Sequence, residues 1–303
     1  MEGDSTIANF GRDSAENVLR ATGSLRALDI RHARLLRLGE NAIYHCPQAH
    51  VVVRIARSMA RWSDAVKEAQ ASRWLDGCGV LVCRLASGDQ PIEVDGHPVT
   101  FWEFIDGRRG RPSDVRQLGD LVGRIHRLLH PAEFVLPRFN PLGRVAARIE
   151  DAPIPDVDRR VLTEMLDEIA AQLPRLDFPH APTVIHGDAH VQNLMVPADG
   201  KPILIDLENV AIGHPEWDLA VTATEWQVAG FWTDEQYQEF VEGYGGFDVT
   251  SWSGFEVLRR AQAIKMTTWL MQNVNESQEI RDEYELRMRT IRDGEPLRCW
   301  TPF

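Results

Sequence analysis

The chain has 303 residues, a length that fits one large domain or two joined lobes, and its 44% hydrophobic and 26% charged residues are ordinary for a globular protein. A net charge of −12 disfavours a nucleic-acid partner and is compatible with a cationic substrate. The sequence contains no apolar run near the roughly 20 residues that cross a bilayer, and its acidic start, MEGDSTIANF, is unlike a signal peptide. We therefore expect a cytoplasmic protein without a membrane partner.

The first hundred residues are expected to form a small, mostly β unit with an inserted helix. Hydrophobic spacing favours helices, whereas short β-branched runs between turn residues favour strands. The dipeptide Asp95-Gly96 is typical of a tight hairpin turn. In chain order, the predicted elements are a helix over 14–36, strands over Ala42–Cys46 and Val51–Ala56, a helix over 64–76, and a hairpin of 92–94 with 98–104.

The composition changes after this β-rich part. A polar, Gly- and Pro-containing connection over 106–114 precedes a part that is mainly helical, with one β-rich insertion over 183–206. The helices are predicted over 114–130, 156–174, 233–243 and 253–273. The sequence thus predicts an α+β protein of two lobes, 1–103 and 104–303, and a cleft between lobes is a usual place for a ligand.

The segment Val184–Ala220, VIHGDAHVQNLMVPADGKPILIDLENVAIGHPEWDLA, carries the chemistry. Phosphoryl transfer needs a carboxylate that holds the acceptor hydroxyl and accepts its proton, and an amide and a second carboxylate that hold magnesium. Asp188 and Asn193 have the five-residue spacing of kinase catalytic loops. We therefore predict that Asp188 is the catalytic base.

A hairpin argument adds the metal ligands. The runs LMV and ILI flank Asp199-Gly200, and a turn centred there pairs Asn193 with Asp206. We predict that these two residues bind magnesium. If the extended conformation continues, Glu208 returns to the same side of the strand and adds a further carboxylate.

The pattern HGDxHxxN, followed by IDxE and G-x-x-x-x-DLA, resembles the aminoglycoside phosphotransferase and choline kinase superfamily, whose fold is protein-kinase-like. The resemblance extends over most of the chain: VVVRIAR is similar to the third strand of the family, KEAQASRWL to its following helix and TFWEFIDG to its interlobe hinge. It implies a kinase that uses ATP or GTP with Mg²⁺ and phosphorylates a hydroxyl of a small molecule. It also implies a nucleotide site at Arg54, Glu68 and the backbone of Glu103, Phe104 and Ile105.

Two positions depart from the pattern of protein kinases. Arg54 stands where they have a lysine, and its planar fork suits phosphate. The glycine-rich loop is reduced to Gly39-Glu40-Asn41, which weakens the case for loop contacts to the phosphates.

Other polar and aromatic residues of this region are assigned mainly structural roles. We expect His186 to orient the loop, Asp218 to brace it, His126 to be a satisfied core histidine, and His190 to act locally rather than on substrate. Trp226 and Trp232 are expected in the core, although they fall where related enzymes shape an acceptor pocket.

Alternative functions follow from the same residues. The acceptor is expected to be an antibiotic, such as an aminoglycoside or another natural product, with inactivation giving resistance. A choline-, sugar- or amino-alcohol-like metabolite is the alternative. His186, Asp188 and His190 alternate as in a metal-dependent hydrolase, a remote alternative that gives Asn193 no function. A nucleotide-binding pseudoenzyme is disfavoured by the complete set of Asp188, Asn193 and Asp206.

Overall fold

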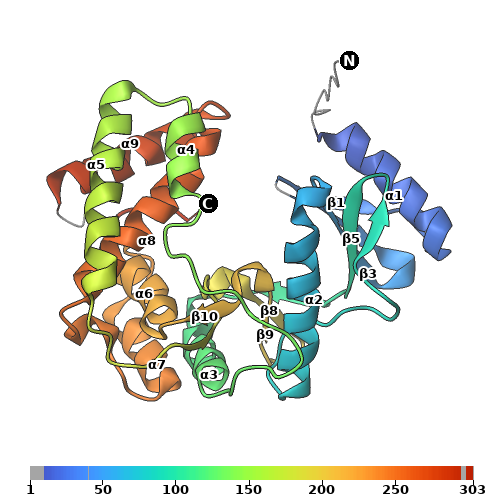
Figure 1. Cartoon of the computed structure of the whole chain (residues 1–303), viewed down its shortest axis with the longest axis horizontal. Coiled ribbons are helices and arrows are strands. Elements are labelled where there is room, and N and C mark those ends of the chain that lie inside the picture. Colours follow the sequence, from blue (N-terminus) through green and yellow to red (C-terminus); the bar gives the residue numbers. More distant parts are fainter. Residues whose placement is uncertain (1–9, 40, 295–297, 303) are drawn as a thin grey trace. The chain divides into compact units, whose positions relative to one another are not determined.

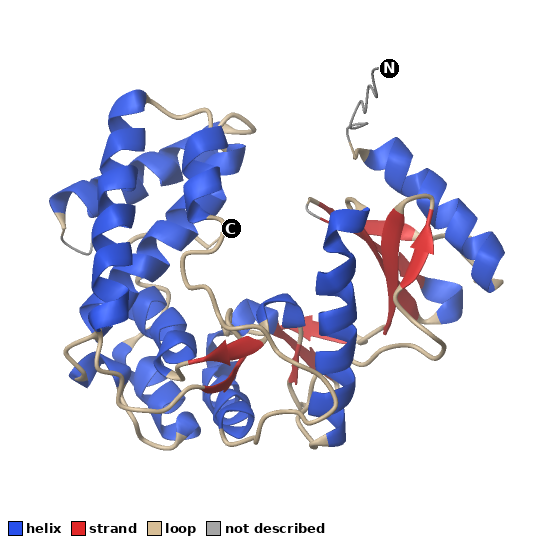
Figure 2. Ribbon diagram, viewed as in Figure 1, coloured by secondary structure: helices blue, strands red, loops and turns tan. Residues whose placement is uncertain are grey.

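The structure is a computed structural model that describes residues 10–39, 41–294 and 298–302. The chain divides into two compact units. Unit 1 comprises Met1–Arg108 and Met195–Glu208, and unit 2 comprises Arg109–Leu194 and Asn209–Phe303. Unit 1 contains the main sheet, whereas unit 2 is mainly helical (Figure 2). The predicted α+β class is therefore confirmed.

The main sheet of unit 1 is antiparallel, with the strand order β1-β2-β3-β5-β4 (Figure 1). Alternate residues of its strands, among them Tyr44, Val53 and Ile55, are buried in one core with the helix α1. Because side chains alternate along a strand, Arg54 lies on the opposite face. The strands are β1 (Arg34–Leu38), β2 (Asn41–Cys46), β3 (Val51–Ala56), β4 (Ile92–Val94) and β5 (His97–Glu103).

Helix α1 (Arg12–Arg26) is shorter than predicted. Ala15, Val18, Leu19 and Thr22 share the buried face that the helical period requires. The helix ends because Ala27 takes a left-handed φ of 50° and its N–H donates to the carbonyl of Gly23. The prediction of a helix over 14–36 is therefore wrong beyond position 26. The apolar residues further on pack against the same core from a loop and from β1, so their helical spacing was coincidental.

Other predictions for unit 1 are confirmed. Strands β4 and β5 form a hairpin in which Val94 pairs with His97, and Asp95 and Gly96 take the positive φ values of the tight turn. The predicted helix 64–76 is α2 (Trp62–Gly77). A second sheet has the order β6-β8-β9, and the pairing of β8 with β9 is the expected hairpin around Asp199-Gly200. Its strands are β6 (Gly107–Arg109), β8 (Leu194–Pro197) and β9 (Ile203–Leu204).

Unit 2 contains helices around a two-stranded antiparallel sheet of β7 (Thr183–Ile185) and β10 (Ala211–Gly213). The structure adds α4, α6, α9, β6 and β10 to the predicted elements. Every residue of α6 is buried, so its sequence lacks the amphipathic period that reveals a helix. The helices are α3 (Val115–His126), α4 (Val145–Asp151), α5 (Asp156–Gln172), α6 (Glu216–Thr224), α7 (Asp234–Tyr244), α8 (Phe255–Leu270) and α9 (Gln278–Asp293).

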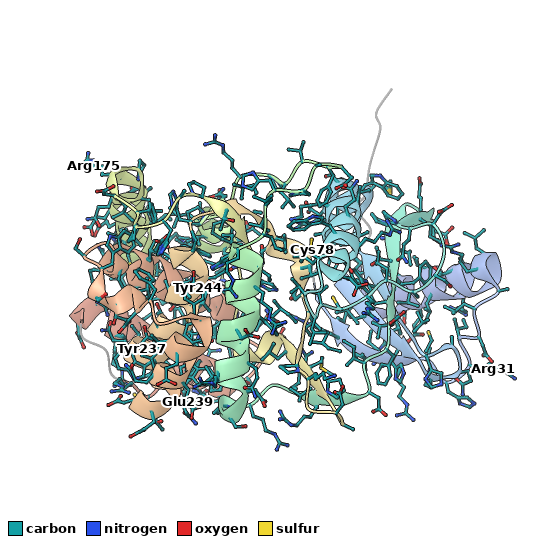
Figure 3. The ribbon with its side chains drawn as sticks, turned by 90° about the horizontal axis from the view of Figure 1, so that it is seen from below. Arg31, Cys78, Arg175, Tyr237, Glu239 and Tyr244 are labelled. Carbon is teal, nitrogen blue, oxygen red and sulfur yellow. The ribbon has the colours of Figure 1, made fainter. Side chains whose placement is uncertain are left out.

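Helices α3 and α7 pack side by side, as Figures 1 and 3 show. A Cβ atom at Gly119 would lie 2.4 Å from the carbonyl oxygen of Phe240, so only glycine permits this approach. The hydroxyl of Tyr244, labelled in Figure 3, lies 3.0 Å from Nδ1 of His126. This contact joins His126, at the end of α3, to Tyr244 at the end of α7.

Candidate active site

One buried carboxylate holds the loop that follows β7. Asp218, in the first turn of α6, is fully buried. Its Oδ1 accepts the backbone N–H of Gly187 at 2.7 Å, and its Oδ2 accepts that of His186 at 2.7 Å and lies 3.0 Å from Nε2 of His126. The indole N–H of Trp217 donates to the carbonyl of Gly187 at 3.2 Å. The predictions that Asp218 braces this loop and that His126 is a satisfied core histidine are confirmed.

Gly187 is required by the shape of the loop. Its φ of 83° lies in the left-handed region, and a Cβ atom would approach the carbonyl oxygen of Asn209 to 2.5 Å. The turn also brings Nδ1 of His186 to 3.3 Å from the backbone nitrogen of Asp188, which agrees with an orienting role for His186. The loop therefore presents Asp188 in one defined position.

Asp188 keeps access to solvent although the loop around it is buried. Its side chain is 36% exposed, and its Oδ2 lies 3.8 Å from Nε2 of His190. Burial acts to raise the pKa of Asp188, but the charges of His190, Lys265, His186 and Arg148 together outweigh it and lower the pKa below its ordinary value. Asp188 is therefore an ionised carboxylate at neutral pH, which can accept a proton.

Asn193 lies in a short 3₁₀ turn, Val191–Asn193, directly before β8. The side chain is 7% exposed, and its Nδ2 donates to the backbone carbonyl of Asp188 at 2.9 Å. This bond fixes the amide so that Oδ1 is the atom that can bind a cation. The donor set suits magnesium, which prefers oxygen ligands, and Asn193 remains a predicted ligand.

In unit 1, Arg54 bridges two carboxylates. Its Nη1 donates to Oε1 of Glu68 at 2.6 Å and its Nη2 donates to Oε2 of Glu208 at 2.6 Å. With its amide oxygen turned toward Arg54, Asn41 accepts from Nε and Nη2 at 3.1 and 2.8 Å. The expected pairing of Arg54 with Glu68 is thus present. Burial acts to lower the pKa of Arg54, whereas Glu68, Asp206 and Glu208 raise it, with a net rise.

Arg54 also opens onto a pocket within unit 1. The pocket combines two arginine side chains with three carboxylates. Glu40, part of the reduced glycine-rich loop, lies outside the described residues. The pocket is lined by Asn41, Arg54, Ala56, Arg61, Asp64, Ala65, Glu68, Pro98, Thr100 and Glu208.

The argument that placed Glu208 beside Asp206 does not hold. Asp206 has a left-handed φ of 64°, and Leu207–Asn209 form a 3₁₀ turn, so the extended conformation ends before Glu208. Glu208 instead contacts Arg54 through its carboxylate, and its backbone carbonyl accepts a hydrogen bond from the ammonium group of Lys67. The roles of Asp206 and Glu208 as metal ligands stay predictions.

The hinge backbone is partly engaged within unit 1. The N–H of Glu103 donates to the carbonyl of Arg84 at 2.9 Å, and the N–H of Phe104 donates to that of His50 at 3.0 Å. Neither bond involves Ile105. The N–H groups of Glu103 and Phe104 are therefore engaged within unit 1, and binding of the nucleotide base at Glu103, Phe104 and Ile105 stays a prediction.

The sequence interpretation missed three ionisable residues that are buried or partly buried, Glu225, Lys67 and Lys265. Helix α6 continues into a π-helical turn, Glu225–Ala229, a feature frequent at functional sites. Burial raises the pKa of Glu225 to about 8; the N–H of Trp232, 3.1 Å from Oε2, opposes this rise and the charge of Asp188 adds to it. Lys67 and Lys265 are the others, and the rarity of lysine was a signal that could have revealed them.

Trp226, one of the two tryptophans singled out in the sequence, stacks on Tyr237, with 4.4 Å between the ring centroids.

The arrangement of a strand-rich unit 1 and a mainly helical unit 2 is a protein-kinase-like fold. A family model described as "Phosphotransferase enzyme family" matches residues 15–258, so the chain belongs to this family. The resemblance to the aminoglycoside phosphotransferase and choline kinase superfamily is therefore confirmed.

Individual relatives differ in their acceptors. Homoserine kinases of Pseudomonas aeruginosa are 29% identical over 154 residues, a match that covers 47% of this chain and 46% of theirs, so it spans about half the length of these relatives. An amicoumacin kinase structure, in complex with AMP-PNP, Ca²⁺ and Ami, has a TM-score of 0.72 at 15% identity and covers 96% of this chain and 98% of its own. A microcompartment-associated aminopropanol kinase has a TM-score of 0.65 at 18% identity, with 90% and 95% covered. The last two likenesses show the fold alone.

Among the described residues, no helix is long and apolar enough to cross a membrane. Within the same part of the chain, no group of three or more His, Cys, Asp or Glu side chains is arranged to hold a metal ion. The remote alternative of a metal-dependent hydrolase gains no support from the family to which the chain belongs.

Proposed function

We propose that the protein transfers the γ-phosphoryl group of ATP, or of GTP, to a hydroxyl of a small molecule, with Mg²⁺ as the metal. The observation that carries this proposal is the braced loop: an ionised, partly exposed Asp188 whose neighbouring backbone is fixed by Asp218. We further propose the lobes 1–103 and 104–303 as the nucleotide-binding part and the catalytic, acceptor-binding part.

Asp188 acts on the acceptor. Its carboxylate accepts a hydrogen bond from the acceptor hydroxyl and orients the oxygen toward the γ-phosphorus. As the new O–P bond forms, the bond from the γ-phosphorus to the bridging oxygen of ADP breaks and ADP leaves with that electron pair. The hydroxyl proton passes to Asp188.

The remaining residues hold the nucleotide. Asn193 and Asp206 supply the principal oxygen ligands of the metal, and Glu208 a further carboxylate. Mg²⁺, when bound, neutralises charge on the phosphates. Arg54, oriented by Glu68, contacts the phosphates, and the base lies against the hinge at Glu103, Phe104 and Ile105.

For the acceptor, we propose an antibiotic, and the amicoumacin kinase of similar fold supports this choice. A small amino alcohol or hydroxy amino acid is the second candidate, because the homoserine kinases match in sequence over 154 residues. We propose resistance by inactivation as the role for the first case and metabolism for the second. A nucleic-acid or membrane partner is not part of either proposal.

A panel assay tests the function. Spectinomycin, amicoumacin, an aminoglycoside, choline, aminopropanol and L-homoserine are incubated separately with ATP and with GTP. ADP or GDP release is followed, and mass spectrometry detects the added phosphoryl group. Turnover of one acceptor class selects between the two candidates. If no hydroxyl compound is phosphorylated while nucleotide binds tightly, the pseudoenzyme alternative replaces the kinase.

The variant Asp188→Asn then tests the assigned base. It keeps the shape but cannot accept the proton, so turnover should fall about 10²- to 10⁴-fold. Calorimetry should show unchanged nucleotide affinity, and the exposed-site control Asp199→Asn should behave as wild type. A collapse of nucleotide affinity in Asp188→Asn would assign Asp188 to the metal site instead.

A further inference from the structure

Lysine is rare in this chain, and its positions are informative. The sequence has 33 lysine and arginine residues, of which only Lys67, Lys201 and Lys265 are lysines. Lys201 is 73% exposed, beside Asp199 in a surface turn. Lys67 and Lys265 lie in helices and are partly buried. Because nearly all other basic residues of the chain are arginines, lysines at these two partly buried positions call for a local reason.

Lys265 lies next to the catalytic loop within unit 2. It extends from α8 so that its Nζ is 4.8 Å from the centroid of the Trp217 ring, a cation–π contact. The indole N–H of Trp217 donates to the carbonyl of Gly187, the residue directly before Asp188. A series of contacts therefore leads from Lys265 through Trp217 to the backbone of Gly187, the residue directly before the base.

The loop itself brings no permanent cation. Residues 186–193, HGDAHVQN, contain neither lysine nor arginine. Burial lowers the pKa of Lys265, and the charges of Asp188 and Asp218 oppose this effect while that of Arg148 adds to it. Asp188 in turn interacts with Lys265, with His186 and His190 of its own loop, with Arg148 of α4 and with Glu225. Lys265 is therefore the lysine that acts on the base.

We propose that Lys265 is a positioning residue for Asp188: its ammonium, held against Trp217, fixes and stabilises the catalytic carboxylate from a distant helix. This inference rests on the proposed function of Asp188 as base. The ammonium of Lys265 lies over the Trp217 ring, and its charge acts on Asp188 through space. Lys265 does not touch the reacting atoms.

The first test needs no acceptor. Selective ¹³Cε labelling of lysine gives one signal for each of the three lysines, and Lys→Arg variants assign them. In Asp188→Asn, the Lys265 signal should shift and its pKa should fall, because the opposing carboxylate charge is gone. The Lys201 signal should not move. A Lys265 signal that stays unchanged in Asp188→Asn overturns the proposal, whatever the acceptor panel shows.

The second test measures turnover of the acceptor that the panel identifies. Lys265→Met should lower kcat about 10²-fold, a size typical of a misplaced catalytic group, with the KM for ATP within about twofold of wild type. Lys265→Arg should recover part of the loss, and Lys201→Met should have no effect.

The decisive comparison is a double-mutant cycle. On the Asp188→Asn background, Lys265→Met should cost nothing further, since Lys265 acts through the missing carboxylate. Losses that multiply would show an independent effect and overturn the proposal. If Lys265→Met fails to fold, Lys265→Gln takes its place in the cycle. A panel without any phosphorylated acceptor counts against the proposed function, while the lysine signals still decide the coupling to Asp188.

Discussion

The brace at Asp218 gives the sharpest prediction on stability and activity together. In Asp218→Asn, one of the two oxygens that accept the N–H groups of His186 and Gly187 becomes an NH₂ donor. A hydrogen bond to a charged group contributes about 1.5–3 kcal/mol, and an orphaned buried N–H costs about 1–3 kcal/mol. Because Asp218 is fully buried, water cannot replace the lost hydrogen bond. We therefore expect a loss of about 3 kcal/mol in the free energy of unfolding.

Activity should fall further than stability explains. A typical domain is stable by about 5–15 kcal/mol, so most molecules of Asp218→Asn should remain folded. The loop, however, loses one of its two fixed N–H groups, and a displacement of Asp188 by about 1 Å can cost about 10²-fold in rate. Nucleotide affinity should change less than kcat, because Asp218 bonds the backbone directly before the base, whereas Arg54, Asp206 and the hinge lie in unit 1.

Urea unfolding monitored by tryptophan fluorescence measures the first effect, and steady-state turnover the second. The matched control is Asp120→Asn, which removes an exposed pair with Arg124 and should cost less than about 0.5 kcal/mol. If Asp218→Asn unfolds at the same urea concentration as the control and retains normal kcat, the position of the loop does not depend on the Asp218 carboxylate.

Three other changes test separate parts of the site. Asp206→Ala should abolish turnover by removing the principal magnesium ligand. Asn193→Ala should lower turnover less, because an amide is a weaker ligand than a carboxylate. Near-normal activity of Asp206→Ala at ordinary magnesium concentrations would contradict the assignment. Arg54→Lys should fold but raise the KM for ATP, since one ammonium cannot bridge two carboxylates as the fork does; unchanged ATP kinetics would place the phosphate-binding cation elsewhere. Glu225 keeps its proton in the folded state up to about pH 8, above its ordinary 4.5, so the unfolded state loses its proton first and stability should fall by up to about 1.4 kcal/mol per pH unit between these values. Thermal melts of Glu225→Gln should show a smaller decline over this range than wild type, and parallel declines would exclude the raised pKa.

Local patterns in the sequence were enough to predict which candidate site residues lie close to one another. Asp188 and Asn193 belong to one short loop, and Arg54 and Glu68 lie on a strand and helix that follow each other closely. The alternation along β3 placed Arg54 on the face opposite the core. In each case the geometry depends on a few adjacent residues, so the pattern carried the information.

The environment of the base could not be predicted in this way. Lys265 and Glu225 reach the loop from helices whose packing is set by the tertiary structure, and α6 gives no amphipathic signal because all of it is buried. The error at Glu208 has a different cause. Asp206 takes a left-handed φ, and aspartate is one of the few non-glycine residues that tolerate this region, so nothing in the sequence marked the break.

Asp188 and Glu225, two acids that interact with each other, have their pKa values shifted in opposite directions, which supports the proposed role of Asp188 as the base. Neighbouring charges outweigh burial at Asp188 and lower its pKa, whereas burial dominates at Glu225 and raises its pKa to about 8. At neutral pH, Glu225 therefore holds a proton and cannot act as a base, while Asp188 is ionised and can accept one. Pairs of acids pushed apart in this manner distinguish the proton acceptor from its neutral neighbour. Removing Lys265 would take away one of the charges that maintain the difference, which is why the proton chemistry of Asp188 should depend on a helix that contributes no residue to the catalytic loop.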